Sequence, residues 1–309
     1  MLFIDKKLDY LLPGIKQNVL LANYTTFKIG GPARYFYQAK TVKDLIKAIR
    51  LAKKKGLSFF VLGQGSNILI SDKGFDGLVI KIEINKLIIN NNRIITGAGV
   101  LLNDLVNKSI KKGLTGLEWA IGIPGTMGGA VRGNAGAFNH SISEIVKKVK
   151  VLKDSKLEFK VYNPKSIKFG YRDSIFKKNN EIILEIELEL KKGDKKKSRE
   201  LIKKYLSHRF QRQPKLSSAG CIFKNPTSGQ AQPGKNSSIK SAGWLIEQCG
   251  LKGKRIGNAE ISEKHANFIV NLGNARAKDV KRLINLCKEE VKERFGMQLE
   301  EEIEYLGKI

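Results

Sequence analysis

The fold of this 309-residue chain is decided by one stretch, Gly63-Gln64-Gly65-Ser66-Asn67-Ile68-Leu69-Ile70. It follows the apolar residues Phe59–Leu62, so it begins like a dinucleotide-binding fingerprint. That fingerprint requires a third glycine and then a helix, but Ile68 takes the glycine position and an apolar strand follows. We therefore predict a strand–turn–strand, not a Rossmann site, with glycines that turn backbone N–H groups toward an anion. A tight turn without a ligand is the alternative that this stretch alone leaves open.

A second, denser glycine segment reads Ile121-Gly122-Ile123-Pro124-Gly125-Thr126-Met127-Gly128-Gly129-Ala130. Glycine loses much conformational freedom on folding, so this density indicates close backbone approach or unusual φ/ψ angles. The apolar residues between the glycines argue against a flexible surface loop, and we predict a buried loop laid against a ligand. No G-x-x-x-x-G-K-[S/T] motif occurs, so an NTPase lacks its main support.

Periodicity predicts both helices and strands in the rest of the chain. Apolar residues at helical spacing predict helices over residues 41–56, 101–112 and 277–295, and Thr41 with Asp44 forms a capping-box pattern. Strands are predicted over residues 58–62, 68–70, 78–82, 93–96 and 182–190. The last strand alternates leucine or isoleucine with glutamate, which is typical of an antiparallel sheet with one wet face. Because helices and strands do not alternate regularly, the fold class is α+β.

A charged run, Lys191 to Lys197, is interpreted as a solvated linker and as the best domain boundary. It divides the chain into residues 1–195 and a smaller part, residues 196–309. We see no internal repeat.

The formal net charge is +28, from 57 Lys+Arg against 29 Asp+Glu. Such an excess attracts phosphate backbones, so a nucleic-acid-binding protein is one alternative. However, the lysines are scattered through nearly every segment, and neither a helix-turn-helix pattern nor an aromatic-rich single-strand platform is evident. We interpret the charge as composition, which still draws in polyanionic small molecules. We expect no nucleic-acid partner.

The metal-binding residue types are few and far apart. Three cysteines, Cys221, Cys249 and Cys287, suit neither a disulfide framework nor a zinc site, and the three histidines show no paired ligand spacing. We therefore expect no metal. No apolar run reaches membrane-spanning length, and charges interrupt any signal-peptide core near the N-terminus. A cytoplasmic protein without a membrane partner is the simplest interpretation.

At this point several segments together resemble a known family. The stretches at residues 63–70, 96–99 (Thr-Gly-Ala-Gly) and 122–130 occur in the order seen in FAD-binding domains of the vanillyl-alcohol-oxidase (PCMH) type. Residues 23–33 (NYTTFKIGGPA) resemble the opening of one branch, the enolpyruvyl-UDP-sugar reductases. The C-terminal third matches the same branch in residues 218–226 (SAGCIFKNP), 242–247 (AGWLIE) and 262–271 (SEKHANFIVN). The resemblance covers nearly the whole chain.

The resemblance implies a PCMH-type FAD domain in two subdomains over residues 1–195 and an α+β UDP-sugar domain over residues 196–309. It also implies NADPH as reductant, a small-molecule UDP-sugar enolpyruvyl ether as substrate, and a monomer. In that class the two glycine segments wrap the FAD pyrophosphate. The implied FAD-binding residues are Gly63, Gln64, Gly65, Ser66, Asn67, Ile68, Gly122, Ile123, Pro124, Gly125, Thr126, Gly128, Gly129 and Ala130.

Three residues match the family's catalytic positions. Arg172 matches the arginine that stabilises the developing enolate; a salt bridge to a neighbour such as Asp173 is the alternative. Cys221 stands where most members carry a serine proton donor, and a thiol with an ordinary pKa of about 8.5 is the stronger acid. A buried structural cysteine is the alternative, and nearby cations that make it a thiolate would remove the proton. Among four glutamates in residues 299–307, only alignment with the family's closing motif selects Glu302, for which an acidic solvent-facing strand is the alternative. We expect the other three glutamates to lie on such a solvent-facing strand.

Two further residues, Lys224 and Asn225, match positions that contact the UDP-sugar, with a polar turn before Pro226 as the alternative. No extra tyrosine-bearing loop stands between Arg172 and Cys221, so the chain resembles the shorter branch of the family. A competing enzyme class is an FAD-dependent alcohol oxidase with the same flavin-binding domain. It predicts a different substrate domain, and the motif around Cys221 and the motif at residues 262–271 count against it.

Overall fold

The structure is a computed structural model that describes residues 10–153, 156–179, 181–226 and 240–309. The chain forms two compact units, each with its own hydrophobic core. The first comprises Met1–Asn18, Tyr35–Gln64 and Gly77–Arg209; the second comprises Val19–Arg34, Gly65–Asp76 and Phe210–Ile309. The units are thus discontinuous in sequence, unlike the linear division at residue 195. The assignment of FAD to residues 1–195 and of substrate to residues 196–309 stays a prediction.

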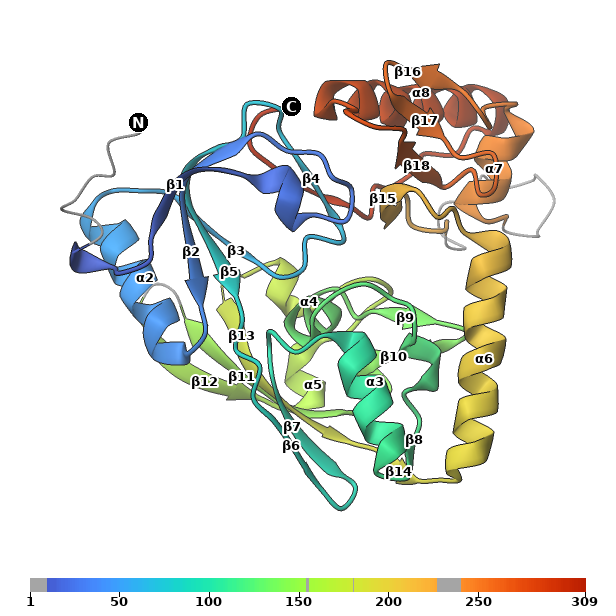
Figure 1. The fold of residues 1–309 in the computed structure, drawn as a ribbon. Helices are drawn as coiled ribbons and strands as arrows, with labels where there is room; N and C mark the ends of the chain where they lie inside the picture. The colour runs from blue at the N-terminus through green and yellow to red at the C-terminus, as the bar shows by residue number, and fades with distance from the viewer. Residues whose placement is uncertain (1–9, 154–155, 180, 227–239) are drawn as a thin grey trace. The chain divides into compact units, whose positions relative to one another are not determined.

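A four-stranded sheet has the order β1-β2-β5-β3. The boundaries between the two units fall within three of its strands, β1, β2 and β5. Its strands are β1 (Lys16–Leu20), β2 (Pro32–Ala39), β3 (Phe59–Leu62) and β5 (Phe75–Ile82). β3 and β5 are parallel, with Phe59 opposite Leu78. Helix α2 (Val42–Lys54) connects β2 to β3 and is amphipathic, with Leu45, Ala48 and Ile49 fully buried. Figure 1 shows β2, β5, β3 and α2 in blue to cyan.

A five-stranded antiparallel sheet, in the order β12-β11-β13-β7-β6, forms much of the first unit. Its strands are β6 (Leu87–Asn90), β7 (Arg93–Gly97), β11 (Val146–Lys153), β12 (Glu158–Tyr162) and β13 (Glu181–Glu189). The predicted alternation in β13 is confirmed, because Leu184, Ile186 and Leu188 are at most 1% exposed. The intervening glutamates lie on the wet face, where they pair with lysines from neighbouring strands.

Shorter elements complete the first unit. The helices are α3 (Leu102–Lys111), α4 (Met127–Arg132), α5 (Pro164–Ile167) and α6 (Lys195–Arg212), the last of which ends three residues beyond the unit. The short strands are β8 (Leu114–Thr115), β9 (Gly136–Ala137), β10 (His140–Ser141) and β14 (Lys191–Lys192). The 3-10 turns are η2 (Glu118–Ala120), η3 (Ile142–Glu144) and η4 (Ile175–Lys177).

The charged run Lys191 to Lys197 is not a linker, and that prediction is wrong. Its first residues form β14, which pairs with β8, and α6 begins at Lys195. The helix is poorly amphipathic, yet Ser198 is 3% exposed and its hydroxyl donates to the buried carboxylate of Glu118. Tyr205 of α6 stacks on Phe138 at a ring separation of 4.3 Å. Residues 191–197 are all exposed, as the charge predicted, but the contacts of Ser198 and Tyr205 hold the segment that follows in the first unit.

The second unit packs two helices against a four-stranded antiparallel sheet in the order β15-β18-β17-β16. Its strands are β15 (Ser217–Cys221), β16 (Arg255–Ile256), β17 (Ala259–Ile261) and β18 (Phe268–Asn271), and its helices are α7 (Ala242–Gln248) and α8 (Ala277–Phe295). Strand β4 (Ile68–Ile70) and the C-terminal strand β19 (Glu304–Leu306) form a separate parallel pair, and η1 (Leu21–Tyr24) precedes β2. The predicted helix over residues 277–295 is confirmed.

Replacement of Thr41 tests the start of α2. The Thr41 hydroxyl accepts from the Asp44 N–H at 3.1 Å, and the Asp44 carboxylate accepts from the Thr41 N–H at 3.0 Å. Thr41→Ala leaves the Asp44 N–H without its cap, so we expect the free energy of unfolding of the first unit to fall by about 1 kcal/mol. Thr41→Ser keeps the hydroxyl and serves as the control in urea unfolding. Equal losses in both variants would contradict a capping role.

Candidate active site

The first glycine turn connects β3 to β4, so the predicted strand–turn–strand is confirmed and no helix follows it. Its first half, Gly63 and Gln64, belongs to the first unit. There the Gln64 side-chain oxygen accepts a hydrogen bond from the Gly125 N–H at 3.0 Å. A Cβ on Gly63 would lie only 2.9 Å from the Thr126 hydroxyl oxygen. Both glycine segments are therefore in direct contact within one unit, which the resemblance to FAD-binding domains requires.

Lys81 is part of this arrangement, and the sequence analysis missed it. It lies in β5, and its ammonium donates to the Gly63 carbonyl. Partial burial lowers the pKa of Lys81, while the nearby Glu83 acts in the opposite direction. The available signal was a single lysine inside the apolar strand Leu78–Ile82, since a lysine at such a place needs a hydrogen-bonding partner.

The second glycine segment is only partly the predicted loop. Residues 122–126 are irregular, but α4 begins at Met127, so the expectation of a loop as far as Ala130 is wrong. Thr126 caps this helix, because its hydroxyl accepts from the Gly129 N–H at 3.4 Å. The Gly128 N–H donates to the Ala98 carbonyl at 2.9 Å, and a Cβ on Gly128 would meet that of Ala98 at 2.9 Å. Gly128 is thus required for close packing against residues 97–99.

Gly129 differs from the glycines that only permit packing. A Cβ built there would have the Thr126 hydroxyl oxygen, 3.7 Å away, as its nearest neighbour. The position is therefore open, although it lies inside a helix where alanine is ordinarily favoured. An open glycine beside two linked glycine segments fits a flat, anionic cofactor that needs close backbone approach. The residues present fit FAD, and the contact of Gly63, Gln64 and residues 122–130 with it stays a prediction.

The second half of the first turn, Gly65, Ser66 and Asn67, belongs to the second unit. Gly65 has φ +65°, and a Cβ there would lie 2.4 Å from the Tyr24 carbonyl oxygen, so only glycine fits. Its carbonyl accepts from the Thr26 N–H at 3.1 Å, and the Thr26 hydroxyl donates to the Ser218 carbonyl at 2.8 Å. Thr26 therefore links the glycine turn to β15, the strand that ends at Cys221.

Within the second unit, the backbone brings Cys221, Glu302 and Asn67 together. The Glu302 N–H donates to the carbonyl of Ile222, the residue after Cys221, at 2.7 Å. The Asn67 side chain donates to the Glu302 carbonyl at 3.0 Å, and the Asn67 carbonyl accepts from the Glu304 N–H at 2.9 Å. Asn67 lies directly before β4, and β19 pairs with β4. Glu302 is thus held between the proton-donor candidate and the last residues of the glycine turn.

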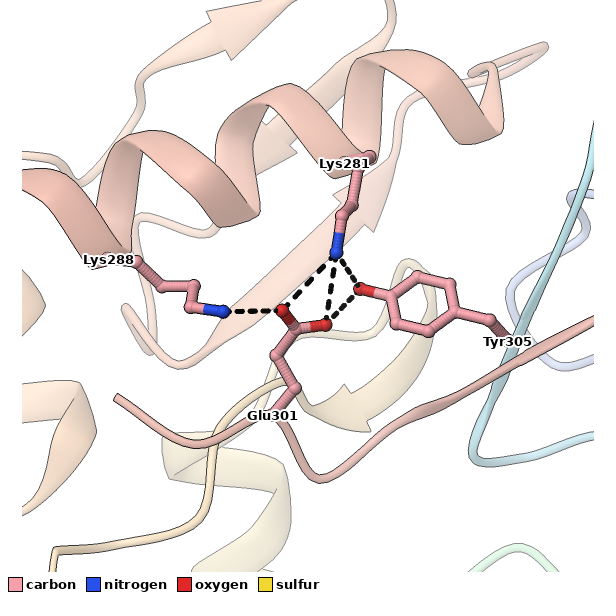
Figure 2. A network of polar contacts seen from close by, with 4 residues as sticks. All are labelled: Lys281, Lys288, Glu301 and Tyr305. Carbon is pink, nitrogen blue, oxygen red and sulfur yellow. Dashed lines mark hydrogen bonds and ion pairs between the residues drawn. The ribbon is translucent and has the colours of Figure 1, made fainter. Parts of the chain in front are cut away.

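The two glutamates that precede Glu302 form ion pairs with lysines. The Glu300 carboxylate pairs with the Lys224 ammonium. Glu301 is held by Lys281 and Lys288 of α8 and by the Tyr305 hydroxyl, and Figure 2 shows these four side chains converging. The Glu301 side chain is only 15% exposed, so the prediction of a solvent-facing residue is wrong for it. Burial alone would raise its pKa, but the hydrogen bonds from Tyr305 and Lys288 and the charge of Lys281 lower it.

Arg172 belongs to the first unit, where it occupies a tight turn. Gly170 and Asp173 exchange backbone hydrogen bonds at 2.9 and 3.2 Å, and Arg172 has the left-handed φ of +55°. A left-handed conformation is uncommon for arginine and occurs at sites that fix a side chain. The Asp173 carboxylate pairs with Lys178 at 3.0 Å; burial would raise its pKa, but the Lys178 hydrogen bond and charge lower it.

The two residues proposed to contact the UDP-sugar have protein partners in the second unit. Lys224 is paired with Glu300, and its side chain is 18% exposed. The Asn225 side-chain oxygen accepts from the Ala242 N–H at 3.1 Å, at the start of α7. Their contact with substrate stays a prediction. Within the described part of the chain, no group of three His, Cys, Asp or Glu residues could hold a metal ion, and no helix is long and apolar enough to cross a membrane.

Comparison with known proteins gives this arrangement a class. Residues 33–156 match the family model described as the FAD binding domain. Residues 212–306 match the C-terminal domain of UDP-N-acetylenolpyruvoylglucosamine reductase. An FAD-binding domain joined to a reductase domain makes this chain an FAD-dependent oxidoreductase.

Relatives along the whole chain define the family. The reductase of this name from Alkaliphilus oremlandii is 41% identical over 93% of this chain and 91% of its own length. That from Clostridium novyi is 37% identical over 98% and 96%. The crystal structure of UDP-N-acetylenolpyruvylglucosamine reductase from Thermus caldophilus superposes with a TM-score of 0.77 at 37% identity, covering 95% of this chain and 100% of that one. This chain belongs to the UDP-N-acetylenolpyruvoylglucosamine reductase family, and its fold is the PCMH-type FAD domain with that family's C-terminal domain.

Replacement of Gly129 tests whether the open position faces FAD. Gly129→Ala places a methyl group where the protein itself leaves space, so the FAD-free protein should be as stable as wild type or slightly more stable. FAD should bind at least about tenfold more weakly, which corresponds to about 1.4 kcal/mol. Flavin fluorescence titration measures the affinity, and thermal unfolding of the FAD-free protein is the control. Unchanged affinity would show that the space faces solvent.

Proposed function

We propose that this chain reduces the enolpyruvyl ether of UDP-N-acetylglucosamine to the lactyl ether, giving UDP-N-acetylmuramate for peptidoglycan precursor synthesis, with NADPH as reductant. The observation that carries the proposal is the backbone ladder that holds Glu302 between the Cys221 strand and Asn67. It joins the acid candidates to the glycine turn in a chain whose family members carry that reductase name. Bound FAD would accept a hydride from NADPH and deliver it to the terminal alkene carbon of the substrate.

The protein's own part is electrostatic. Hydride arrival at the terminal carbon leaves negative charge on the adjacent carbon and on the carboxylate beside it. Arg172 is the cation proposed to bind that carboxylate, because a guanidinium fork can donate to both oxygens. Its left-handed turn fixes the backbone from which the side chain projects, and such preorganisation favours stabilisation of charge that develops only in the transition state.

Cys221 is proposed to protonate the adjacent carbon. The thiol S–H bond breaks, the carbon–hydrogen bond forms, and the resulting thiolate regains a proton from solvent. Cys221 closes β15 at a bulge, with Gly220 at φ +78° before it and Phe268 of β18 opposite. Such a bulge re-aims a side chain out of the regular pleat. Glu302, on the neighbouring segment, is the third catalytic residue proposed for this site.

Binding of the UDP-sugar is assigned to Lys224 and Asn225, with the local positive charge drawing in the diphosphate. The enzyme is proposed to act as a cytoplasmic monomer without nucleic-acid or membrane partners. The alternative of an FAD-dependent alcohol oxidase is less well supported, because residues 212–306 match the reductase C-terminal domain.

The proposed reaction is tested by an anaerobic absorbance titration of the FAD-loaded protein. We expect NADPH to bleach the flavin bands and the enolpyruvyl ether of UDP-N-acetylglucosamine to restore them. A flavin that NADPH reduces but that this substrate does not reoxidise would contradict the proposed substrate. A flavin that NADPH does not bleach would contradict the proposed reductant.

Substitution of Cys221 tests the proton donor. Cys221→Ser keeps an O–H at this position and should retain substantial substrate reduction. Cys221→Ala removes the acid and should slow reoxidation of the reduced flavin by substrate at least about 100-fold, the lower range for loss of a positioned acid. Flavin reduction by NADPH, which needs no donor at the substrate carbon, is the internal control in stopped-flow measurements. An alanine variant as fast as wild type would rule Cys221 out.

A further inference from the structure

The run Glu300-Glu301-Glu302 poses a problem of register. Three identical side chains follow one another, and a slip of one residue along the ladder would exchange Glu302 for Glu301 at the site. The ladder hydrogen bonds do not prevent such a slip, because backbone groups are the same at every residue. The Lys224 N–H donates to the Glu300 carbonyl at 2.9 Å, and Phe223 stands opposite Glu301. Something in the side chains must fix this pairing.

The Glu301 network, which consists of Glu301, Lys281, Lys288 and Tyr305, is the most specific feature of this segment. Lys288 donates to one carboxylate oxygen at 2.9 Å, and Lys281 contacts both oxygens at 3.3 and 3.4 Å. The Tyr305 hydroxyl donates to the second oxygen and accepts from Lys281 at 3.0 Å. Figure 2 shows the lysines descending from α8 onto a carboxylate on the C-terminal segment. Both carboxylate oxygens are thus engaged from two elements.

Neighbouring burial shows which way the segment faces. Leu299 and Ile303 are 2% and 5% exposed and lie in the core of the second unit with α8. Glu301 lies between them and faces the same helix, as alternate residues of an extended segment do. Glu300, on the opposite side, is paired with Lys224. By the same alternation, Glu302 is expected on the side of the segment that Glu300 shares.

We propose that Glu301 is a positioning residue, and that its network on α8, together with the buried Leu299 and Ile303, holds the register that places Glu302 beside the Cys221 strand and Asn67. This inference rests on the proposed function, because it assigns Glu301 a role through Glu302. Loss of the network removes the polar contacts that hold the segment between Leu299 and Ile303 against α8. The segment is then held less tightly, and Glu302 is less often in place beside the Cys221 strand, while Leu299 and Ile303 keep the fold.

The test is Glu301→Gln in the FAD-loaded enzyme, followed as two separate half-reactions. Glutamine has the same shape but lacks the charge that the two lysines require. We expect reoxidation of the flavin by substrate to slow at least about tenfold, within the range that one mispositioned acid accounts for. Flavin reduction by NADPH should stay within about twofold of wild type. Equal slowing of both half-reactions, or of neither, would overturn the proposal.

Glu260→Gln is the matched control. Glu260 is likewise a buried carboxylate of the second unit, 6% exposed and paired with Arg255. It lies on β17 and not in the C-terminal segment. Its loss should lower the melting temperature about as much as Glu301→Gln does but leave substrate reduction unchanged. If Glu260→Gln slowed substrate reduction as much, the effect would be one of general stability and the proposal would fail.

A double-mutant cycle separates positioning from direct catalysis. If Glu301 acts through Glu302, then Glu301→Gln should change the substrate half-reaction by less than about twofold in a Glu302→Gln background. Additive losses would overturn the proposal, because Glu301 would then act by another route. Lys288→Gln, which leaves Lys281 and Tyr305 on the carboxylate, serves if Glu301→Gln does not fold, and should show the same selective slowing to a smaller extent. A wild-type enzyme that the substrate does not reoxidise would instead contradict the proposed function.

Discussion

The parallel pairing of β4 with β19 is the constraint on which the candidate site in the second unit depends. Next to this pair, the Asn67 side chain donates to the Glu302 carbonyl, 235 positions later in the chain. The end of the chain must therefore return to the glycine turn before the site can form. Closing so long a loop costs entropy, and the ladder's few backbone hydrogen bonds offset only part of that cost. Burial of Leu299, Ile303 and Leu306, each at most 5% exposed, offsets the rest of that entropic cost. The same apolar residues that close the fold thereby carry Glu302 to its place.

Glycine has two distinct roles in the proposed flavin site. At Gly65 and Gly128 the protein itself occupies the space where a Cβ would lie, so these residues are required by packing and by backbone angle. A Cβ on Gly129 would meet only the Thr126 hydroxyl oxygen, at an ordinary contact distance of 3.7 Å, so the protein itself leaves room there. Density of glycine in a sequence does not separate these roles. The distance from a built Cβ to its neighbours does, because it distinguishes close approach within the protein from space left for a cofactor.

The elements with strong periodicity could be predicted from the sequence, and those held by single contacts could not. The helices over residues 41–56 and 277–295 and strand β13 follow directly from the spacing of their apolar residues. Helix α6 has almost no apolar face, so its lysines indicated a linker; Ser198 and Tyr205 fix it through partners that sequence distance conceals. The candidate site residues came from motif resemblance. A single lysine in an apolar strand was a local signal for Lys81, but it could not show that the partner is the Gly63 carbonyl. Local reasoning could not separate Glu301 from Glu302 either.

Charge alone could not have made that last distinction either. In a chain with 57 lysines and arginines against 29 acidic residues, any exposed glutamate finds a cation nearby, and an exposed ion pair adds little stability. One glutamate is preferred over its neighbours where the cations are partly buried and a hydroxyl contacts the same carboxylate. If another residue took its place, those buried groups would be left desolvated and unpaired. Lys281, Lys288 and Tyr305 meet that condition, and Lys224 meets it only in part. The arrangement of a few lysines on one helix, and not the excess of lysine, therefore acts with the buried Leu299 and Ile303 to determine which of three identical side chains reaches the proposed active site.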